Sequence, residues 1–218
     1  MTRALEFGRK GPEKGTSLVV LLHGYGADGN DLLGLADPLA PHLPGTVFVA
    51  PDAPDPCSGN PFGRQWFPIP WLDGSSEAEA AAAMAEAQAD LAAFVQARMA
   101  AEGVGEAQTA LIGFSQGTMM ALHLAPRWPQ PFAAVVGFSG RLLRPETLAA
   151  EVVSRPPILL AHGDQDDVVP FDDMNRAGRA LQEAGFDVYG HVMKGTGHGI
   201  APDGLGAALS FLRERLPG

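Results

Sequence analysis

The sequence predicts an α/β fold, in which helices cover both faces of a mostly parallel central sheet. Three observations support this. Several short apolar runs rich in β-branched residues end near Gly, Pro or Asp. Most are apolar at nearly every position, as strands buried on both faces are. Helical stretches separate several of them, and this alternation is typical of parallel sheets. The expected strands are Leu18–Leu22, Val47–Ala50, Ala110–Ile112, Ala133–Phe138, Ile158–Ala161 and Val188–Met193.

The clearest expected helix is the Ala-rich segment Glu77–Ala101, which we expect to cover one face of the sheet. Ser75 or Ser76 can cap its N-terminus, acidic residues occupy its first turn, and Gly103 follows its end. The other expected helices are Thr118–Ala125, Asp173–Ala184 and Leu205–Leu216.

Length and composition narrow the function classes. The 218 residues fit one domain, spanning 1–218, and the formal net charge is −10. Such a charge repels phosphate backbones and anionic bilayers, so we expect no nucleic-acid partner. Cys57 is the only cysteine, which excludes an intramolecular disulfide and a cysteine-based zinc site. No apolar run approaches ~18 residues and the N-terminus has no leader-like segment, so we expect a cytoplasmic protein without stable membrane insertion.

The motif that points to chemistry is Gly113-Phe114-Ser115-Gln116-Gly117, which lies between an expected strand and an expected helix. This is the context of a nucleophile elbow, a tight turn that exposes a serine hydroxyl above the sheet. The flanking glycines avoid Cβ collisions, and the helix N-terminus points N–H groups at the site. Ser115 is therefore the expected nucleophile. The similar Gly137-Phe138-Ser139-Gly140 has no fifth-position glycine and no clear helix behind it, so we expect Ser139 to be structural.

A serine nucleophile needs a general base, and the base needs an orienting carboxylate. Two loops that follow expected strands supply both, in the chain order Ser, Asp, His. Such loops open at the carboxyl edge of a parallel sheet, where ligands bind. His198, flanked by glycines in the second loop, is the expected base. The first loop offers the carboxylates of Asp164, Asp166 and Asp167.

The other five histidines fit a structural role better. His42 lies in a Pro-rich turn, His123 inside a helix and His191 within a strand, while His23 and His162 end strands just before Gly.

The oxyanion that forms on an attacked carbonyl needs two backbone donors. The first is expected from the residue after the nucleophile, Gln116. The second is expected from the loop His23–Gly29, where the N–H of Tyr25 is the candidate.

The segment Pro51–Gly74 is a long loop rich in Pro and Gly, and such loops often have a function. We expect its large apolar residues to form a wall beside Ser115 that binds an acyl chain. The alternative is that Trp66 only anchors the loop in the core. The residues of the expected wall are Phe62, Trp66, Phe67, Ile69 and Trp71.

Taken together, five motifs spread over nearly the whole chain resemble the phospholipase/carboxylesterase family, whose best-known members are acyl-protein thioesterases. They are Leu22-His23-Gly24-Tyr25-Gly26, Trp66-Phe67, Gly113–Gly117, His162-Gly163-Asp164-Gln165-Asp166-Asp167-Val168-Val169-Pro170 and Gly197-His198.

The resemblance implies a compact α/β-hydrolase fold without a large cap domain, and hydrolysis of acyl esters, lysophospholipids or S-acyl groups without a cofactor. Asp164 is expected to be a turn residue. Position by position, the resemblance makes Ser115 the nucleophile, Asp166 rather than Asp167 the acid, His198 the base, and Tyr25 and Gln116 the oxyanion donors.

The sequence also has features of other functions. Gly24–Gly29 matches G-x-G-x-x-G and Asp52 follows a later strand, as in dinucleotide-binding proteins. Against this, Asp28 would lie beside a pyrophosphate, Asn30-Asp31 make a poor helix start, and the Ser, Asp and His loops would go unexplained. A non-catalytic binding protein and a peptidase on the same fold are further alternatives. A metal hydrolase is disfavoured because H-E-x-x-H is absent. The leaving group, the acyl chain length and the oligomeric state, a homodimer included, stay open.

Overall fold

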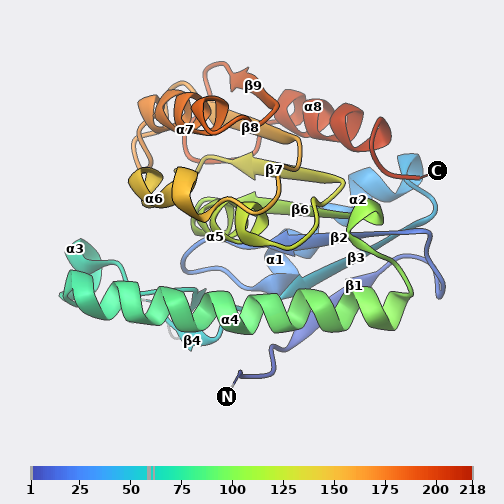
Figure 1. Ribbon diagram of the computed structural model, residues 1–218, viewed down its shortest axis with the longest axis horizontal. Coiled ribbons are helices and arrows are strands. Elements are labelled where there is room, and N and C mark those ends of the chain that lie inside the picture. The colour runs from blue at the N-terminus through green and yellow to red at the C-terminus, as the bar shows by residue number, and fades with distance from the viewer. Residues whose placement is uncertain (1, 58–59, 61, 218) are drawn as a thin grey trace.

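The computed structural model describes residues 2–57, 60 and 62–217. Within them, seven strands form one sheet in the order β1-β3-β2-β6-β7-β8-β9 (Figure 1). Every neighbouring pair is parallel except β1, which runs antiparallel to β3 at one edge. The strands are β1 (Phe7–Lys10), β2 (Ser17–Leu22), β3 (Thr46–Pro51), β6 (Thr109–Phe114), β7 (Ala134–Phe138), β8 (Ile158–Gly163) and β9 (Val188–Met193).

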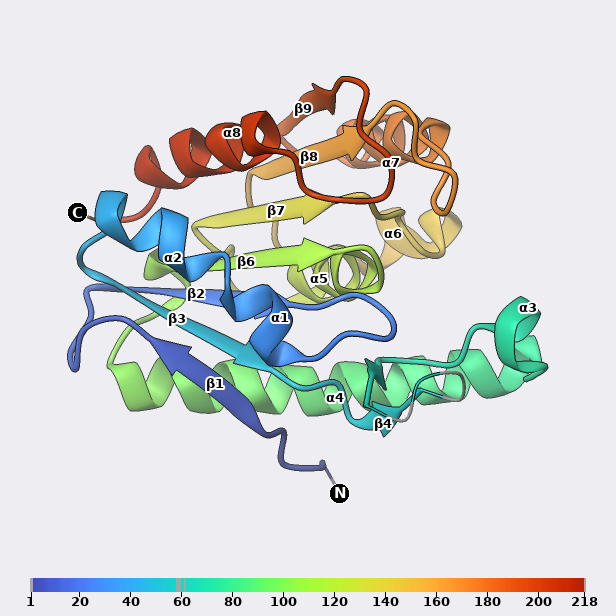
Figure 2. The same cartoon turned by 180° about the vertical axis from the view of Figure 1, so that it is seen from behind.

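Helices lie on both faces of this sheet, as the two opposite views show (Figures 1 and 2). One face packs on α4, α5 and α7, and the other packs on α1, α2 and α8. The helices are α1 (Gly29–Leu33), α2 (Ala36–Leu39), α3 (Pro70–Asp73), α4 (Glu77–Glu102), α5 (Gln116–Arg127), α6 (Pro145–Glu151), α7 (Asp172–Glu183) and α8 (Pro202–Arg213), with short 3₁₀ turns at Ala40–His42 and Glu106–Gln108.

The six strands expected from apolar runs are confirmed, with ends that shift by at most two residues. The strand β1 was not expected. It has four residues, it is only partly buried, and it carries the charged Arg9 and Lys10, so it lacks an apolar signal. The short helices α1, α2, α3 and α6 were also not expected, because four to seven residues give too little periodicity to recognise.

The four expected helices are confirmed, although α8 spans Pro202–Arg213 rather than Leu205–Leu216. Proline suits the first turn of a helix, where its missing N–H costs nothing. Helix α4 follows its predicted caps closely. The Ser76 hydroxyl accepts from the Glu79 N–H while the Glu79 carboxylate accepts from the Ser76 N–H, and Gly103 ends the helix in a left-handed conformation.

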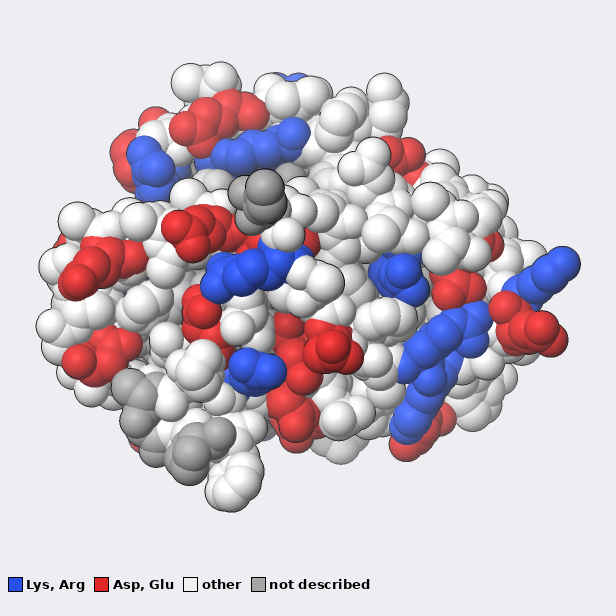
Figure 3. Space-filling model, turned by 90° about the horizontal axis from the view of Figure 1, so that it is seen from below, with Lys and Arg blue, Asp and Glu red and all other residues white. Residues whose placement is uncertain are grey.

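The face that α4 and β1 present carries acidic and basic side chains interspersed with one another (Figure 3). Arg3 pairs with Asp55 and Asp90, and Arg9 pairs with Glu102. Among the described residues, no helix combines the length and the apolar character needed to cross a bilayer.

The sheet places the candidate site. Because β2, β3, β6, β7, β8 and β9 run parallel, their carboxyl ends share one edge, and the loops that follow them open there. The long loop after β3 contains a two-stranded hairpin of β4 (Asp55–Pro56) and β5 (Arg64–Gln65). Positions 58, 59 and 61 of this loop lie outside the described residues.

Candidate active site

Ser115 occupies a strained turn between β6 and α5. Its φ of 52° lies in the left-handed region, which non-glycine residues rarely adopt. The Ser115 N–H donates to Phe138 O at 2.9 Å, which ties the turn to the end of β7. A Cβ on Gly113 would lie 2.4 Å from Thr118 N, and one on Gly117 would lie 1.9 Å from Leu22 O. The elbow geometry therefore requires glycine on both sides of the serine.

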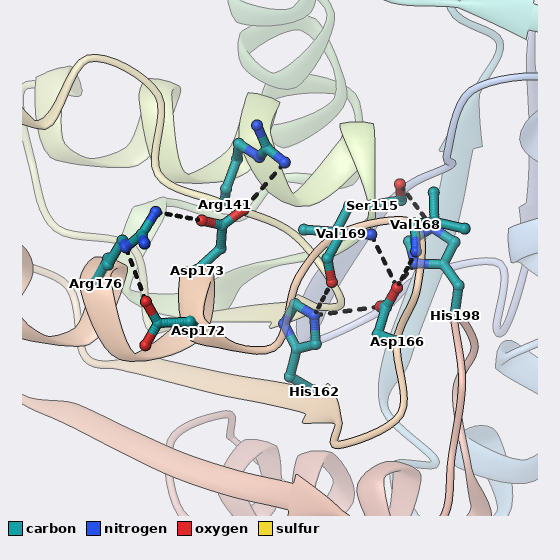
Figure 4. Close-up of polar contacts among 10 residues, drawn as sticks. All are labelled: Ser115, Arg141, His162, Asp166, Val168, Val169, Asp172, Asp173, Arg176 and His198. Atoms are coloured by element: carbon teal, nitrogen blue, oxygen red, sulfur yellow. Dashed lines mark hydrogen bonds and ion pairs between the residues drawn. The ribbon is translucent and has the colours of Figure 1, made fainter.

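Three side chains from separate loops meet at this edge of the sheet (Figure 4). Ser115 Oγ lies 3.0 Å from His198 Nε2, and His198 Nδ1 lies 2.8 Å from Asp166 Oδ2. The His198 side chain is 18% exposed, whereas that of Asp166 is fully buried. The Phe114 ring packs against the imidazole with the ring centroids 4.9 Å apart. The arrangement can relay a proton from a hydroxyl to an imidazole that a buried carboxylate holds in place.

The three aspartates of the loop after β8 have different surroundings. Asp166 is buried and reaches His198, whereas the neighbouring Asp167 is exposed and lies on the rim of the pocket described below. Asp164 accepts a hydrogen bond from the Gly195 N–H at 2.7 Å and so joins the two loops. Of the three, only Asp166 contacts the imidazole.

The pKa of the Asp166 carboxyl lies below its ordinary value. Burial raises this pKa. The hydrogen bonds from His198 and from the N–H groups of Val169 and Val168 lower it, and so does the positive charge of a protonated His198. Together these lowering effects outweigh burial. Asp166 therefore stays anionic near neutral pH, and it can accept the Nδ1–H of His198. This leaves the lone pair of His198 Nε2 facing the Ser115 hydroxyl.

The two residues expected to bind the oxyanion come from different segments. Gln116 is the first residue of α5, and Tyr25 lies in the loop after β2 and lines the same pocket as Ser115. The hairpin braces the Tyr25 loop, since the Gly26 N–H donates to Arg64 O and the Arg64 N–H donates to Ala27 O. The geometry of the oxyanion contacts themselves stays a prediction.

A pocket of about 700 Å³ opens above Ser115 and His198. Phe67, Ile69 and Trp71 from the expected wall line it. The pocket also draws on segments that the sequence did not indicate, because they are distant along the chain. These are α4, which contributes Glu77, Ala80, Ala81 and Met84, the β7–α6 loop, which contributes Arg141, Leu143 and Arg144, and the α5 residue Met119.

Two residues of the expected wall lie elsewhere, and the prediction was wrong for them. Trp66 is fully buried in the core, where its indole N–H donates to His23 O. Phe62 is 91% exposed and does not line the pocket. The alternative considered for Trp66, that it anchors the loop, matches its position. The anchoring uses Gln116, whose side chain accepts from the Trp66 N–H and donates to Phe67 O, both at 2.8 Å.

The other histidines have partners of their own or lie away from Ser115. The buried His23 contacts Gly24 O and accepts from the Ala53 N–H. Burial lowers the pKa of His123 to about 4, and nearby Arg127 adds to this. His191 pairs with Asp203 on the surface. His162 is the exception, because it touches Asp166 and thus the candidate site, a contact that its position at a strand end did not reveal.

The glycine motif Gly24–Gly29 does not form a dinucleotide site of the usual kind. The expectation of a poor helix start there was wrong, since α1 begins at Gly29 with the Asp28 side chain accepting from the Asp31 N–H. However, this helix has only five residues, and the carboxylate of Asp28 already caps its N-terminus. Asp52, the candidate ribose ligand, instead accepts a hydrogen bond from the Gly29 N–H.

Comparison with known proteins gives consistent matches. A family model described as phospholipase/carboxylesterase matches residues 9–216. Esterase YpfH of Escherichia coli (strain K12) is 32% identical over 201 residues, covering 92% of this chain and 83% of that protein. Acyl-protein thioesterase 1 of Neurospora crassa is 30% identical over 218 residues, covering 93% and 88%. The crystal structure of esterase PE8 has a TM-score of 0.93 at 45% identity, covering 98% of this chain and 100% of that chain.

The elbow packing generates a stability prediction. Gly117→Ala should lower the melting temperature and the esterase activity together, because the added Cβ meets the backbone of Leu22, which cannot move aside. Gly206→Ala is the matched control, since a Cβ there meets nothing within 4 Å and alanine favours a helix by up to about 1 kcal/mol. Thermal melting and ester hydrolysis of both variants check this. A Gly117→Ala protein that melts like the wild type would contradict it.

Proposed function

Because the chain belongs to the phospholipase/carboxylesterase family of α/β-hydrolases, we propose that it hydrolyses acyl esters or thioesters through Ser115, His198 and Asp166. The observation that carries the proposal is the continuous hydrogen-bonded series Ser115–His198–Asp166 at the floor of an apolar-walled pocket. Lysophospholipids fall in the same substrate class, because they are carboxylic esters with one acyl chain.

In the first half-reaction, Ser115 Oγ attacks the carbonyl carbon of the substrate while His198 Nε2 takes the hydroxyl proton. The carbonyl oxygen becomes an oxyanion, which the N–H groups of Gln116 and Tyr25 stabilise. His198 then gives its proton to the departing alcohol or thiol, and the acyl group stays on Ser115 as an ester.

In the second half-reaction, a water molecule takes the place of the leaving group. His198 accepts a proton from this water as its oxygen attacks the acyl carbon, and then returns the proton to Ser115 Oγ as the carboxylic acid leaves. Throughout, anionic Asp166 holds the Nδ1–H of His198 and stabilises the positive charge that the imidazole carries between the steps.

The acyl chain is assigned to the pocket wall of Phe67, Ile69 and Trp71. Met84 from α4 and Leu143 from the β7–α6 loop add further apolar lining. Burial of apolar surface is the force that would hold it there, and this force grows with each methylene. The charged Glu77, Asp167, Arg141 and Arg144 also line the pocket, so its charge is balanced rather than of one sign.

The first prediction concerns the nucleophile. Ser115→Ala should lose about 10⁶-fold in kcat for ester substrates while the fold is retained, by comparison with other triads. Ser139→Ala is the matched control, since Ser139 is also buried with positive φ but does not line the pocket. A fluorophosphonate probe should label the wild type and the control at Ser115 and leave Ser115→Ala unlabelled. A folded, active Ser115→Ala protein would refute the proposed function.

The second prediction separates the two adjacent aspartates. Asp166→Asn should lower kcat by about 10⁴-fold, because an amide in place of the carboxylate no longer holds the required tautomer of His198. Asp167→Asn should change it little, because Asp167 is exposed and does not touch the imidazole. Steady-state kinetics on one ester decide the matter, and the reverse ranking would reassign the acid.

The third prediction separates the pocket wall from the loop anchor. Each added methylene should raise kcat/KM about fourfold until the wall ends, which corresponds to ~0.8 kcal/mol per CH₂. Trp71→Ala should flatten this gain for long chains and leave acetate esters and the melting temperature nearly unchanged, because Trp71 lines the pocket but is 74% exposed.

Trp66→Ala should behave differently. It should destabilise the fold by about 3–5 kcal/mol and lower the activity alike for all chain lengths, because Trp66 is buried in the core. A series of p-nitrophenyl esters from acetate to octanoate, with a melting curve for each variant, tests both. The assignment of the wall fails if Trp66→Ala alone changes the chain-length dependence.

A further inference from the structure

His162 is a buried histidine that the proposed reaction does not use. It lies in β8, four residues before Asp166, and it is 1% exposed. Its ring meets Phe171 edge-on, with centroids 6.0 Å apart. The ring nitrogen Nε2 lies 2.9 Å from Val169 O and 3.2 Å from Asp166 Oδ2, and both contacts are drawn in Figure 4.

These two partners fix the protonation of the ring nitrogen. A carbonyl oxygen and a carboxylate oxygen can only accept hydrogen bonds. If Nε2 carried a lone pair, it would face two other lone pairs in a site without water access, which is unfavourable. Nε2 therefore carries a hydrogen, which it donates to Val169 O, and this N–H group lies beside Asp166 Oδ2.

The polar contacts around Asp166 close into a ring. Oδ1 accepts from the N–H groups of Val168 and Val169 at 3.0 and 2.9 Å, and Oδ2 accepts from His198 Nδ1 at 2.8 Å. His162 Nε2 donates to the carbonyl of Val169, whose N–H already binds Asp166, and it also lies 3.2 Å from Oδ2. Asp166 and Val169 are thus held from both sides, so the carboxylate has one orientation.

We propose that His162 is a positioning residue for the active site. Its Nε2–H holds the carbonyl of Val169, whose own N–H orients Asp166, and its closeness to Oδ2 lowers the negative potential at the oxygen that faces His198. This inference rests on the proposed role of Asp166 as the acid of the triad. His162 does not line the pocket, so it acts on the substrate only through Asp166 and His198.

The proposal has an electrostatic consequence. A carboxylate that donors surround holds less free charge, and it stabilises a positive imidazolium less strongly than a bare carboxylate does. Without His162, Asp166 would hold protonated His198 more firmly, and the base would stay protonated to a higher pH. The acidic limb of the kcat/KM profile would then move to higher pH. Four charged residues line the same pocket as His198 and are unchanged in the variants below: Glu77, Arg141, Arg144 and Asp167.

Two substitutions at His162 test this in the full-length protein. His162→Leu removes the donor, and His162→Gln keeps an N–H at nearly the position of Nε2. For His162→Leu we expect kcat to fall about 10–100-fold, with little change in KM. Losses of this size are found when a residue that orients a functional side chain is removed. We expect the midpoint of the acidic limb to rise by roughly 0.5 to 1 pH unit. His162→Gln should restore both values toward the wild type.

The matched control is His123→Leu, which removes a half-buried histidine from α5 that has no contact with Asp166. It should leave the position of the acidic limb unchanged. A His162→Leu protein with the wild-type limb, or a His162→Gln protein that behaves like His162→Leu, overturns the proposal. Ser115→Ala is measured alongside: if it retains activity the proposed function fails, and if only the His162 variants disagree the triad stands without this role.

A measurement on the wild type keeps the test independent of how the variants fold. Nitrogen-15 NMR of histidine-labelled protein distinguishes the two neutral tautomers of each ring. His162 should carry its hydrogen on Nε2, and the Nδ1–H form would overturn the proposal.

Discussion

The feature on which the rest of the structure depends is the contact between the elbow and β2. At Gly117, the first turn of α5 packs so closely on the carbonyl of Leu22 that a methyl group has no room. This closeness forces the chain to turn within one residue, and Ser115 takes up the strain in its positive φ. Such strain costs of the order of 1–3 kcal/mol, and the buried apolar face of α5 offsets it. The packing consequently fixes the backbone position of Ser115 at the end of β6.

A second close contact joins the loops that carry the proposed acid and the proposed base. A Cβ on Gly163 would lie 2.2 Å from Thr196 O, so the loops after β8 and β9 pack backbone against backbone. Hydrogen bonds reinforce this, from the Gln165 N–H to Thr196 O and from the Gly195 N–H to the Asp164 side chain. These contacts hold Asp166 and His198 next to each other, although 32 residues separate them. Two glycine contacts thus hold the three side chains in register: one places Ser115, and the other places its two partners.

These constraints explain which parts of the fold and of the site could be predicted from the sequence. Strands buried on both faces have nearly continuous runs of apolar residues, so they could be recognised. The glycines around Ser115 and His198 mark places where two backbone segments pack closely, so these two loops could be recognised as well. The edge strand β1 and the short α1 lack such signals, since their residues are polar or few. The pocket residues from α4 and from the β7–α6 loop could not be predicted, for another reason. Their side chains meet Ser115 only after the chain has folded, and spacing along the sequence does not encode this.

The loop after β3 shows why residue type alone does not separate a core residue from a pocket residue. Trp66 and Trp71 are five positions apart in one aromatic segment, yet the first is fully buried and the second is mostly exposed. The Gln116 side chain makes the difference. It bonds to the backbone on both sides of Trp66, at the Trp66 N–H and the Phe67 carbonyl, and this turns the indole inward and presents the following residues to the pocket. Gln116 also follows the nucleophile directly. The residue whose N–H is assigned to the oxyanion thus holds the pocket wall in place, so the position of the wall is tied to the position of Ser115.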